Sequence, residues 1–69
     1  MVGLTDKQEE TMKYLREYIN EKFYPPSVRE IGKRFGISTK AAFDRLLAME
    51  IKGVIKRTAG IARGIQILK

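Results

Sequence analysis

The sequence predicts a small, mainly helical α+β domain in which three helices are followed by a C-terminal β-hairpin. Three observations lead to this expectation. The chain has 69 residues, which is enough for one core, so residues 1–69 are expected to form a single domain. Three capping sequences each precede apolar residues at helical spacing. After residue 53 the apolar pattern changes to short runs rich in β-branched residues, which is typical of strands.

The first helix is expected over roughly residues 6–22. Thr5 and Gln8 have the spacing of a capping box, in which two side chains satisfy backbone N–H groups at the helix start. Pro25 follows, and a proline pushes the residue before it out of the helical region. The face that packs against the core is expected to carry Met12, Leu15, Ile19 and Phe23.

Ser27 and Glu30 form a second capping box, which predicts a short helix over about residues 28–35. Ser38 or Thr39 is expected to cap the third helix. Lys52 would end that helix with a cation, which suits the negative end of a helix dipole. The expected core stripes are Val28, Ile31 and Phe35 on the second helix, and Ala42, Leu46 and Met49 on the third.

The junction between the second and third helices has the residues that a helix-turn-helix requires. Gly36 stands where a left-handed cap residue belongs, and apolar Ile37 can fill the space between the helices. Gly32 would cost about 1 kcal/mol relative to Ala inside a helix, so a close helix packing is expected to require it. Any corner between two helices would accept these residues as well.

The hairpin is expected to pair residues 54–57 with residues 64–68 across a loop from Thr58 to Arg63. Three helices followed by a β-hairpin is the winged helix-turn-helix arrangement, which the sequence therefore predicts. Outside the core stripe, the third helix carries another apolar row, made of Phe43, Leu47 and Ile51. We expect this row to pack under the hairpin, with a contact to another chain as the alternative.

Composition excludes several classes of site. The chain contains no Cys and no His, which removes disulfides, thiolate or imidazole metal ligands, and triads built on either residue. No apolar run approaches the roughly 20 residues that cross a bilayer. The first four residues do not have the basic-then-apolar pattern of a leader, so we do not expect export. We expect a cytoplasmic protein that is not an enzyme, with no catalytic residues, no metal, no cofactor, no small-molecule ligand and no membrane partner.

Charge points to a polyanionic partner. The net charge is +6, and the uneven distribution gives residues 1–35 a net +1 and residues 36–69 a net +5. A basic half on a small domain favours nucleic acid, because each phosphate contact releases counterions. The alternative is a lysine-rich surface that serves solubility.

The chain resembles the N-terminal DNA-binding domain of the LexA family, the repressors of the bacterial DNA-damage (SOS) response. Two runs carry the resemblance together, Pro-Pro-Ser-x-x-Glu-Ile at residues 25–31 and Leu-x-x-Met-Glu-x-Lys-Gly-x-Ile at residues 46–55. Other matching residues extend it over the whole chain: Leu4, Thr5, Gln8, Arg34, Phe35, Ala42 and Arg63 to Ile65. Such repressors carry a second, self-cleaving peptidase domain. This chain is therefore expected to be an excised domain or a stand-alone relative.

The resemblance implies a transcriptional repressor that reads an inverted-repeat operator in double-stranded DNA as a pair, with the third helix in the major groove. The implied reading residues are Ser38, Thr39, Lys40, Ala41, Phe43 and Asp44. Lys40 suits guanine acceptors, Asp44 a cytosine amino group, and Ala41 or Phe43 a thymine methyl. The alternatives are a merely solvated carboxylate for Asp44 and ordinary burial for Phe43. Better-known members carry Asn and two Glu here, which implies a different half-site.

Phosphate contacts are expected from the helix and hairpin cations Arg29, Lys52, Lys56, Arg57 and Arg63. Arg63 is expected to leave the hairpin toward DNA, and the alternative is an ion pair with a carboxylate such as Glu50. Charge and the glycine turn favour DNA binding. The alternative function is a stand-alone winged-helix module that mediates protein–protein contact.

Overall fold

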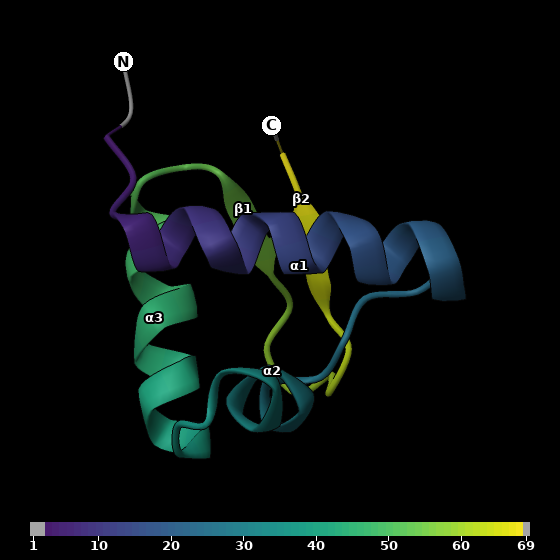
Figure 1. Cartoon of the computed structure of the whole chain (residues 1–69). Helices are drawn as coiled ribbons and strands as arrows, with labels where there is room; N and C mark the ends of the chain where they lie inside the picture. The colour runs from purple at the N-terminus through teal and green to yellow at the C-terminus, as the bar shows by residue number, and fades with distance from the viewer. Residues whose placement is uncertain (1–2, 69) are drawn as a thin grey trace.

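The structure, a computed structural model, describes residues 3–68, so Met1, Val2 and Lys69 at the ends of the expected domain lie outside the described residues. Its elements are α1 (Asp6–Lys22), α2 (Val28–Phe35), α3 (Thr39–Ile51), β1 (Ile55–Arg57) and β2 (Ile65–Ile67). Figure 1 shows α1 across the top, α3 descending below it, α2 at the bottom and the hairpin behind α1. The predicted winged helix-turn-helix fold is confirmed.

All three expected helix starts are present. Thr5 and Gln8 form the predicted capping box, with both hydrogen bonds at 3.1 Å. Ser27 and Glu30 form the second box, in which the Glu30 carboxylate accepts from the Ser27 N–H at 2.8 Å. Ser38 is the residue that caps α3, because its hydroxyl accepts a backbone N–H of the first helical turn. Local side chains therefore fix where each helix begins.

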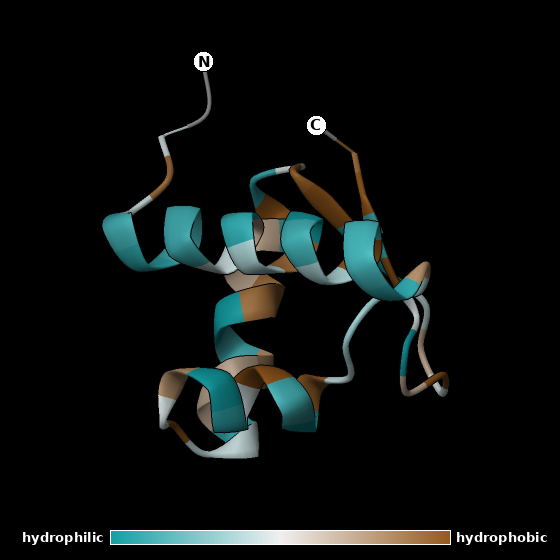
Figure 2. Ribbon diagram, turned by 45° about the vertical axis from the view of Figure 1, so that its right-hand side comes forward, coloured by the Kyte–Doolittle hydropathy of each residue, from teal (hydrophilic) through white to brown (hydrophobic). Residues whose placement is uncertain are grey.

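One core joins the three helices to the hairpin. Figure 2 shows α1 as largely hydrophilic along its length, while the strands carry both hydrophobic and hydrophilic residues. The buried apolar side chains are Met12, Leu15, Ile31, Ala42, Leu46, Met49, Val54, Ile55 and Ile65. Within residues 3–68, no helix combines the length and the apolar character that membrane crossing requires.

The strands are shorter than the sequence indicated, and their register fixes what they bury. They pair antiparallel with Ile55 opposite Ile67 and Arg57 opposite Ile65. Ile55 and Ile65 face the core, while the middle residue of each strand is exposed. Two strands of three residues cannot cover the outer row of α3, so the expectation that this row packs under the hairpin is wrong for Ile51, which is 80% exposed.

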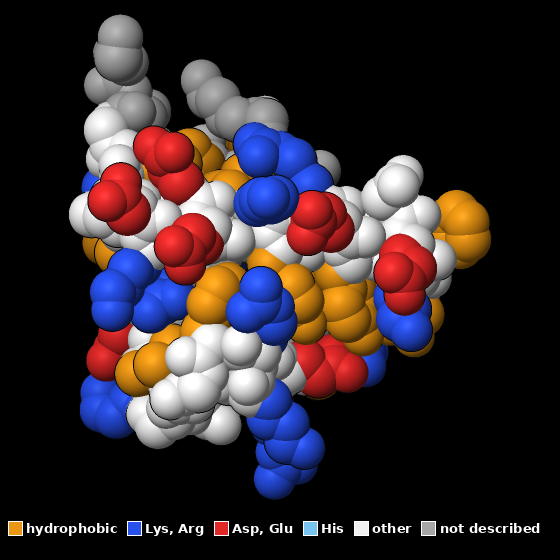
Figure 3. Space-filling model, in the orientation of Figure 1, with side chains coloured by type: hydrophobic (Ala, Val, Ile, Leu, Met, Phe, Trp, Pro, Cys, Tyr) orange, Lys and Arg blue, Asp and Glu red, His pale blue; other side chains and the backbone are white. Residues whose placement is uncertain are grey.

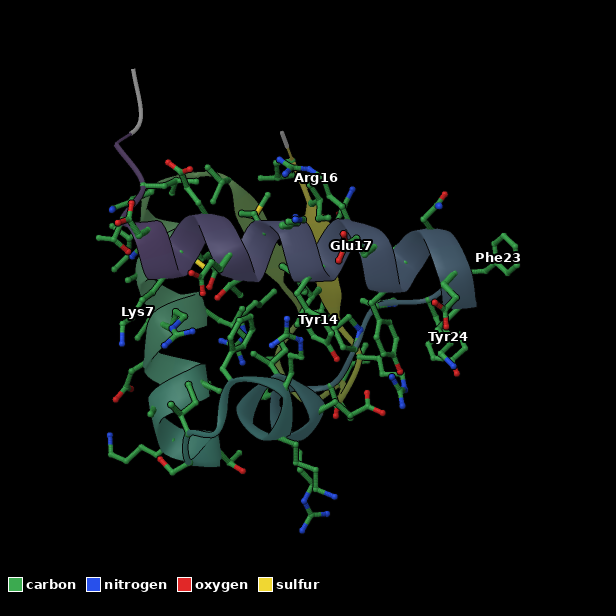
Figure 4. All side chains as sticks on the ribbon, in the orientation of Figure 1. Lys7, Tyr14, Arg16, Glu17, Phe23 and Tyr24 are labelled. Carbon is green, nitrogen blue, oxygen red and sulfur yellow. The ribbon has the colours of Figure 1, made fainter. Side chains whose placement is uncertain are left out.

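The expectation that Phe23 extends the core stripe of α1 is also wrong. The helix ends at Lys22, and Phe23 is its C-cap in the left-handed conformation, with φ +68°. Its N–H still donates to the Ile19 carbonyl at 2.8 Å, but the left-handed turn directs the side chain off the helical face. The ring is 88% exposed, and Figure 4 shows it pointing away from the end of α1.

Aromatic side chains fasten α1 to α2. Tyr14 and Tyr18, four residues apart on α1, pack edge to face with ring centroids 5.8 Å apart. Tyr14 points from α1 toward α2, where its ring meets Phe35 at 5.7 Å. Edge-to-face contacts of this kind add to the energy of burial.

The helix-turn-helix junction depends on two glycines. Gly36 is the C-cap of α2 with φ +66°, a conformation that strains other residues. The chain then returns so closely that a Cβ on Gly32 would lie 2.9 Å from the Ile37 carbonyl oxygen. The Ile37 N–H donates to the Gly32 carbonyl at 2.9 Å across the same turn. Gly32 is therefore required by the close approach of the chain that leads into α3.

We expect Gly32→Ala to lower the free energy of unfolding by about 1 kcal/mol or more, because relieving the backbone contact outweighs the usual gain in helix propensity. Urea denaturation followed by circular dichroism measures this change. Gly3→Ala is the control, because nothing lies within 4 Å of the added Cβ. A Gly32→Ala variant as stable as the parent would contradict the steric assignment.

Candidate nucleic-acid interface

The first two turns of α3 present an exposed face to solvent. Ala42, Leu46 and Met49 are fully buried and anchor the opposite face of the helix. The structure brings all six predicted reading residues together on this exposed surface: Ser38, Thr39, Lys40, Ala41, Phe43 and Asp44. An exposed helix face held rigidly by a buried stripe has the geometry that major-groove reading requires.

The two charged residues on this face are paired with each other. The Lys40 ammonium lies 3.2 Å from the Asp44 carboxylate, one helical turn away. Their side chains are 84% and 57% exposed, so the pair contributes little stability in water. A partner with its own hydrogen-bonding groups can therefore separate the pair at small cost and engage either charge.

Phe43 is partly exposed, which contradicts the alternative that it is an ordinary buried residue. Its side chain is 39% exposed and lies under the Arg57 guanidinium, whose carbon is 4.4 Å from the ring centroid. The Arg57 backbone N–H donates to the Glu50 carboxylate at 3.2 Å, which fixes β1 beside α3. This cation–π contact joins the wing, as we call the β1–β2 hairpin and its loop (residues 55–67), to α3. No local pattern indicates it, since the two residues meet only after the hairpin folds back.

A groove separates the beginning of α2 from the loop between β1 and β2. Its lining residues are Ser27, Val28, Arg29, Arg57, Gly60, Ile61 and Ala62. The lining contains two arginines and no acidic side chain. On the face shown in Figure 3, acidic and basic side chains both lie along α1, and further Lys and Arg side chains project from the lower edge. The groove and the exposed face of α3 together form the candidate interface.

Lys52 was expected to contact phosphate, but in the structure it bonds to groups within the domain. Its ammonium donates to the Gly3 carbonyl and to the Gln8 side chain, both at 2.6 Å. Gln8 belongs to the capping box of α1, so Lys52 ties the end of α3 to the start of the first helix. The ammonium is thus engaged in a contact within the domain.

Arg63 also turns inward, contrary to the expectation that it leaves the hairpin. Its guanidinium donates to both Glu30 carboxylate oxygens, at 2.7 and 3.1 Å, and to the Pro25 carbonyl at 2.9 Å. It also donates to the Tyr18 hydroxyl at 3.2 Å and lies over the Tyr24 ring at 4.7 Å. The alternative of an ion pair was right in kind, but the partner is Glu30 and not Glu50.

The environment of Glu30 stabilises its ionised form. Hydrogen bonds from Arg63, followed by the backbone N–H of Ser27, lower the Glu30 pKa from 4.5 to about 2. The same contact raises the pKa of Arg63, chiefly through the hydrogen bond to Glu30. Sequence reasoning identified Glu30 only as a capping residue. The capping motif did mark its position, but not its partner 33 residues away.

We expect this ion pair to make the domain sensitive to acid. Because the Glu30 pKa is lower in the folded state, its contribution to stability is full above pH 4.5 and is lost as the pH falls toward about 2. Glu30→Gln keeps a side chain that suits a capping box but removes this titration. The fall in melting temperature over that range should be smaller in Glu30→Gln than in the parent, as measured by thermal denaturation at each pH. Equal falls would show that the pair does not contribute.

Comparison of the chain with known protein families and sequences agrees with this geometry. Residues 1–64 match the family described as the LexA DNA binding domain. Over all 69 residues the chain is 45% identical to a LexA repressor of Leptospira biflexa, 41% to one of Leptospira interrogans and 42% to one of Thermotoga maritima. The chain spans about a third of the length of these relatives. On this evidence the chain belongs to the LexA DNA-binding domain family.

Proposed function

We propose that this chain binds double-stranded DNA sequence-specifically, as the DNA-binding part of a LexA-like transcriptional repressor. The observation that carries the proposal is the exposed face of α3, which its buried stripe presents as one rigid surface beside a groove lined by two arginines. An α-helix fits the major groove, where base edges differ between all four base pairs. Membership of the LexA DNA-binding domain family supports the same function.

In this proposal the reading residues retain the roles that their chemistry suggests. Lys40 donates to guanine acceptors, and Asp44 accepts from a cytosine amino group once their mutual pair opens. Ala41 and Phe43 offer apolar contact to thymine methyl groups, and the Arg57 guanidinium keeps the Phe43 ring in place. The remaining two, Ser38 and Thr39, lie at the start of α3, where that helix would enter the groove.

Four of the five expected phosphate contacts divide into two groups, and Lys56, which is exposed on β1, stays a predicted contact outside both. Arg29 and Arg57 line the groove between α2 and the wing, and we propose that they bind phosphates directly. Lys52 and Arg63 engage partners within the domain, and we propose that they support DNA binding indirectly. Residues 1–69 then act as one domain that works in the bacterial cytoplasm and is associated with the nucleoid when bound.

A salt titration tests this function against its alternative, a module that mediates protein–protein contact. The row formed by Phe43, Leu47 and Ile51 favours that alternative, because all three side chains are partly or largely exposed. Duplex affinity measured by fluorescence anisotropy should fall steeply and linearly on logarithmic axes as salt rises. Duplex binding that is absent, or that salt does not affect, would reject the DNA-binding function and leave the protein contact.

We expect Lys40→Ala and Arg29→Ala to affect DNA binding differently. Lys40 faces the bases, so its loss should cost about 1–3 kcal/mol on an operator obtained by in vitro selection and little on random duplex. Arg29 contacts phosphate, which carries no sequence information, so its loss should weaken both complexes by a similar factor. Titrations of both variants on both duplexes measure the specificity ratio. An equal ratio in the two variants would contradict the division of roles.

We also propose that two copies bind an inverted-repeat operator. A duplex that carries two selected half-sites should then bind two copies of the chain, and a duplex with one half-site should bind one. Analytical ultracentrifugation of the complexes measures the stoichiometry. A single copy bound to the two-half-site duplex at saturation would contradict pairing.

A further inference from the structure

The wing loop and the start of α2 form opposite walls of the groove, and each wall carries one arginine. Arg29 belongs to α2, and Arg57 ends β1 just before the wing loop. The distance between the walls determines whether the two cations can meet phosphates of one duplex together. The wing cannot set that distance by itself, because its two strands have only three residues each.

Arg63 fastens the wing loop to the opposite wall. It leaves the loop directly after Ala62, a lining residue of the groove, and it reaches Glu30, which directly follows Arg29 in α2. Four hydrogen bonds from its guanidinium end on Tyr18, Pro25 and both Glu30 oxygens. The contact therefore joins the two walls next to the residues that line them.

From this arrangement we propose that Arg63 and Glu30 are positioning residues for DNA binding. Their ion pair holds the wing at the distance from α2 at which Arg29 and Arg57 contact the phosphates of one duplex, and neither Arg63 nor Glu30 contacts DNA itself. The inference rests on the proposed DNA-binding function.

The chemistry of the pair suits a fixed spacing. The planar guanidinium engages the carboxylate through two parallel hydrogen bonds, a geometry that fixes orientation as well as distance. Glu30 is held in turn by the Ser27 N–H at 2.8 Å, so its carboxylate is part of the first turn of α2 and not a free side chain. Tyr18 donates to the same carboxylate at 3.2 Å from a third element, α1.

Electrostatics separates this role from a direct phosphate contact. Glu30→Gln removes a negative charge beside the groove and raises the net charge from +6 to +7. Through charge alone this substitution would tighten DNA binding. If the ion pair positions the wing, the same substitution weakens binding. The sign of the effect therefore distinguishes the two roles.

The experiment measures affinity for random duplex over a salt series, below the unfolding temperature of every variant. The variants are Glu30→Gln, Arg63→Gln, Arg63→Lys and the double variant Glu30→Gln/Arg63→Gln. Glu17→Gln is the matched control, because it removes an exposed carboxylate that lies on α1 and does not line the groove. Glu30→Gln suits the test because Gln also fits a capping box.

We expect Glu30→Gln and Arg63→Gln each to weaken binding about fivefold and to lower the salt slope, since the loosened wing makes fewer phosphate contacts. The double variant should be no weaker than the weaker single variant, because both substitutions break one contact. Arg63→Lys, which keeps the charge but loses the two-pronged contact, should lie between Arg63→Gln and the parent. Glu17→Gln should bind as tightly as the parent or more tightly.

Two results of the binding measurements would overturn the inference. One is a Glu30→Gln variant that binds as tightly as the parent or more tightly. The other is a salt slope that falls in Arg63→Gln but not in Glu30→Gln. That result would make Arg63 a direct phosphate contact. If the parent protein does not bind duplex at all, the proposed function fails. If the parent binds and Glu30→Gln binds equally well, only the inference about the ion pair fails.

Hydrogen exchange of the free protein tests, without DNA, whether the Arg63–Glu30 ion pair holds the wing loop. The amides of Thr58 and Gly64 bond within the wing loop, to the carbonyls of Gly64 and Ile61 at 2.8 and 3.1 Å. We expect both amides to exchange faster in Glu30→Gln and Arg63→Gln, while amides in the middle of α1 keep the parent rate. Unchanged exchange in the wing loop would show that the ion pair does not hold it, and would overturn the inference.

Discussion

The close approach of the chain at Gly32 is the constraint on which the rest of the structure depends. The carbonyl of Ile37 occupies the space that a side chain at position 32 would need, and the left-handed Gly36 turns the chain into that space. This junction sets the crossing of α2 and α3. With that crossing fixed, Ala42, Leu46 and Met49 reach the core, and the opposite face of α3 is left exposed.

Some of the basic side chains bond to groups within the domain, and others are exposed to solvent. Lys52 secures the start of α1, and Arg63 secures the wing against α2. Net charge therefore overstates the number of cations available to a polyanion. Arg29 and Arg57 line the groove, and Lys40 stands on the exposed face of α3 in a weak, solvent-exposed pair. The dependence of DNA affinity on salt concentration would therefore reflect Arg29, Arg57 and Lys40 and not Lys52 or Arg63.

The wing is joined to the helix-turn-helix at two places by different chemistry. Near α3, the Arg57 guanidinium lies over the Phe43 ring, and the Arg57 backbone is held by Glu50. Near α2, Arg63 is paired with Glu30. A hairpin with strands of three residues is marginal by itself, so these contacts give it a defined position.

Features that arise from residues near one another in the chain can be predicted from the sequence. The capping boxes at Thr5 and Ser27, the glycine turn and the core stripe of α3 all follow from spacings of three to seven residues, and the structure has each of them. The motif residues of positions 25–31 and 46–55 likewise indicate the LexA family.

Contacts between side chains that lie far apart in the chain are visible only in the folded protein. The partner of Arg63 lies 33 residues away, and that of Lys52 lies 44 residues away. Phe43 and Arg57 come together only when the hairpin folds back on α3. A periodic pattern records which face of a helix is apolar, but not which charged group from another element will lie opposite. The exposure of Phe23 has the same origin, because a left-handed cap ended the helix one residue before the stripe did.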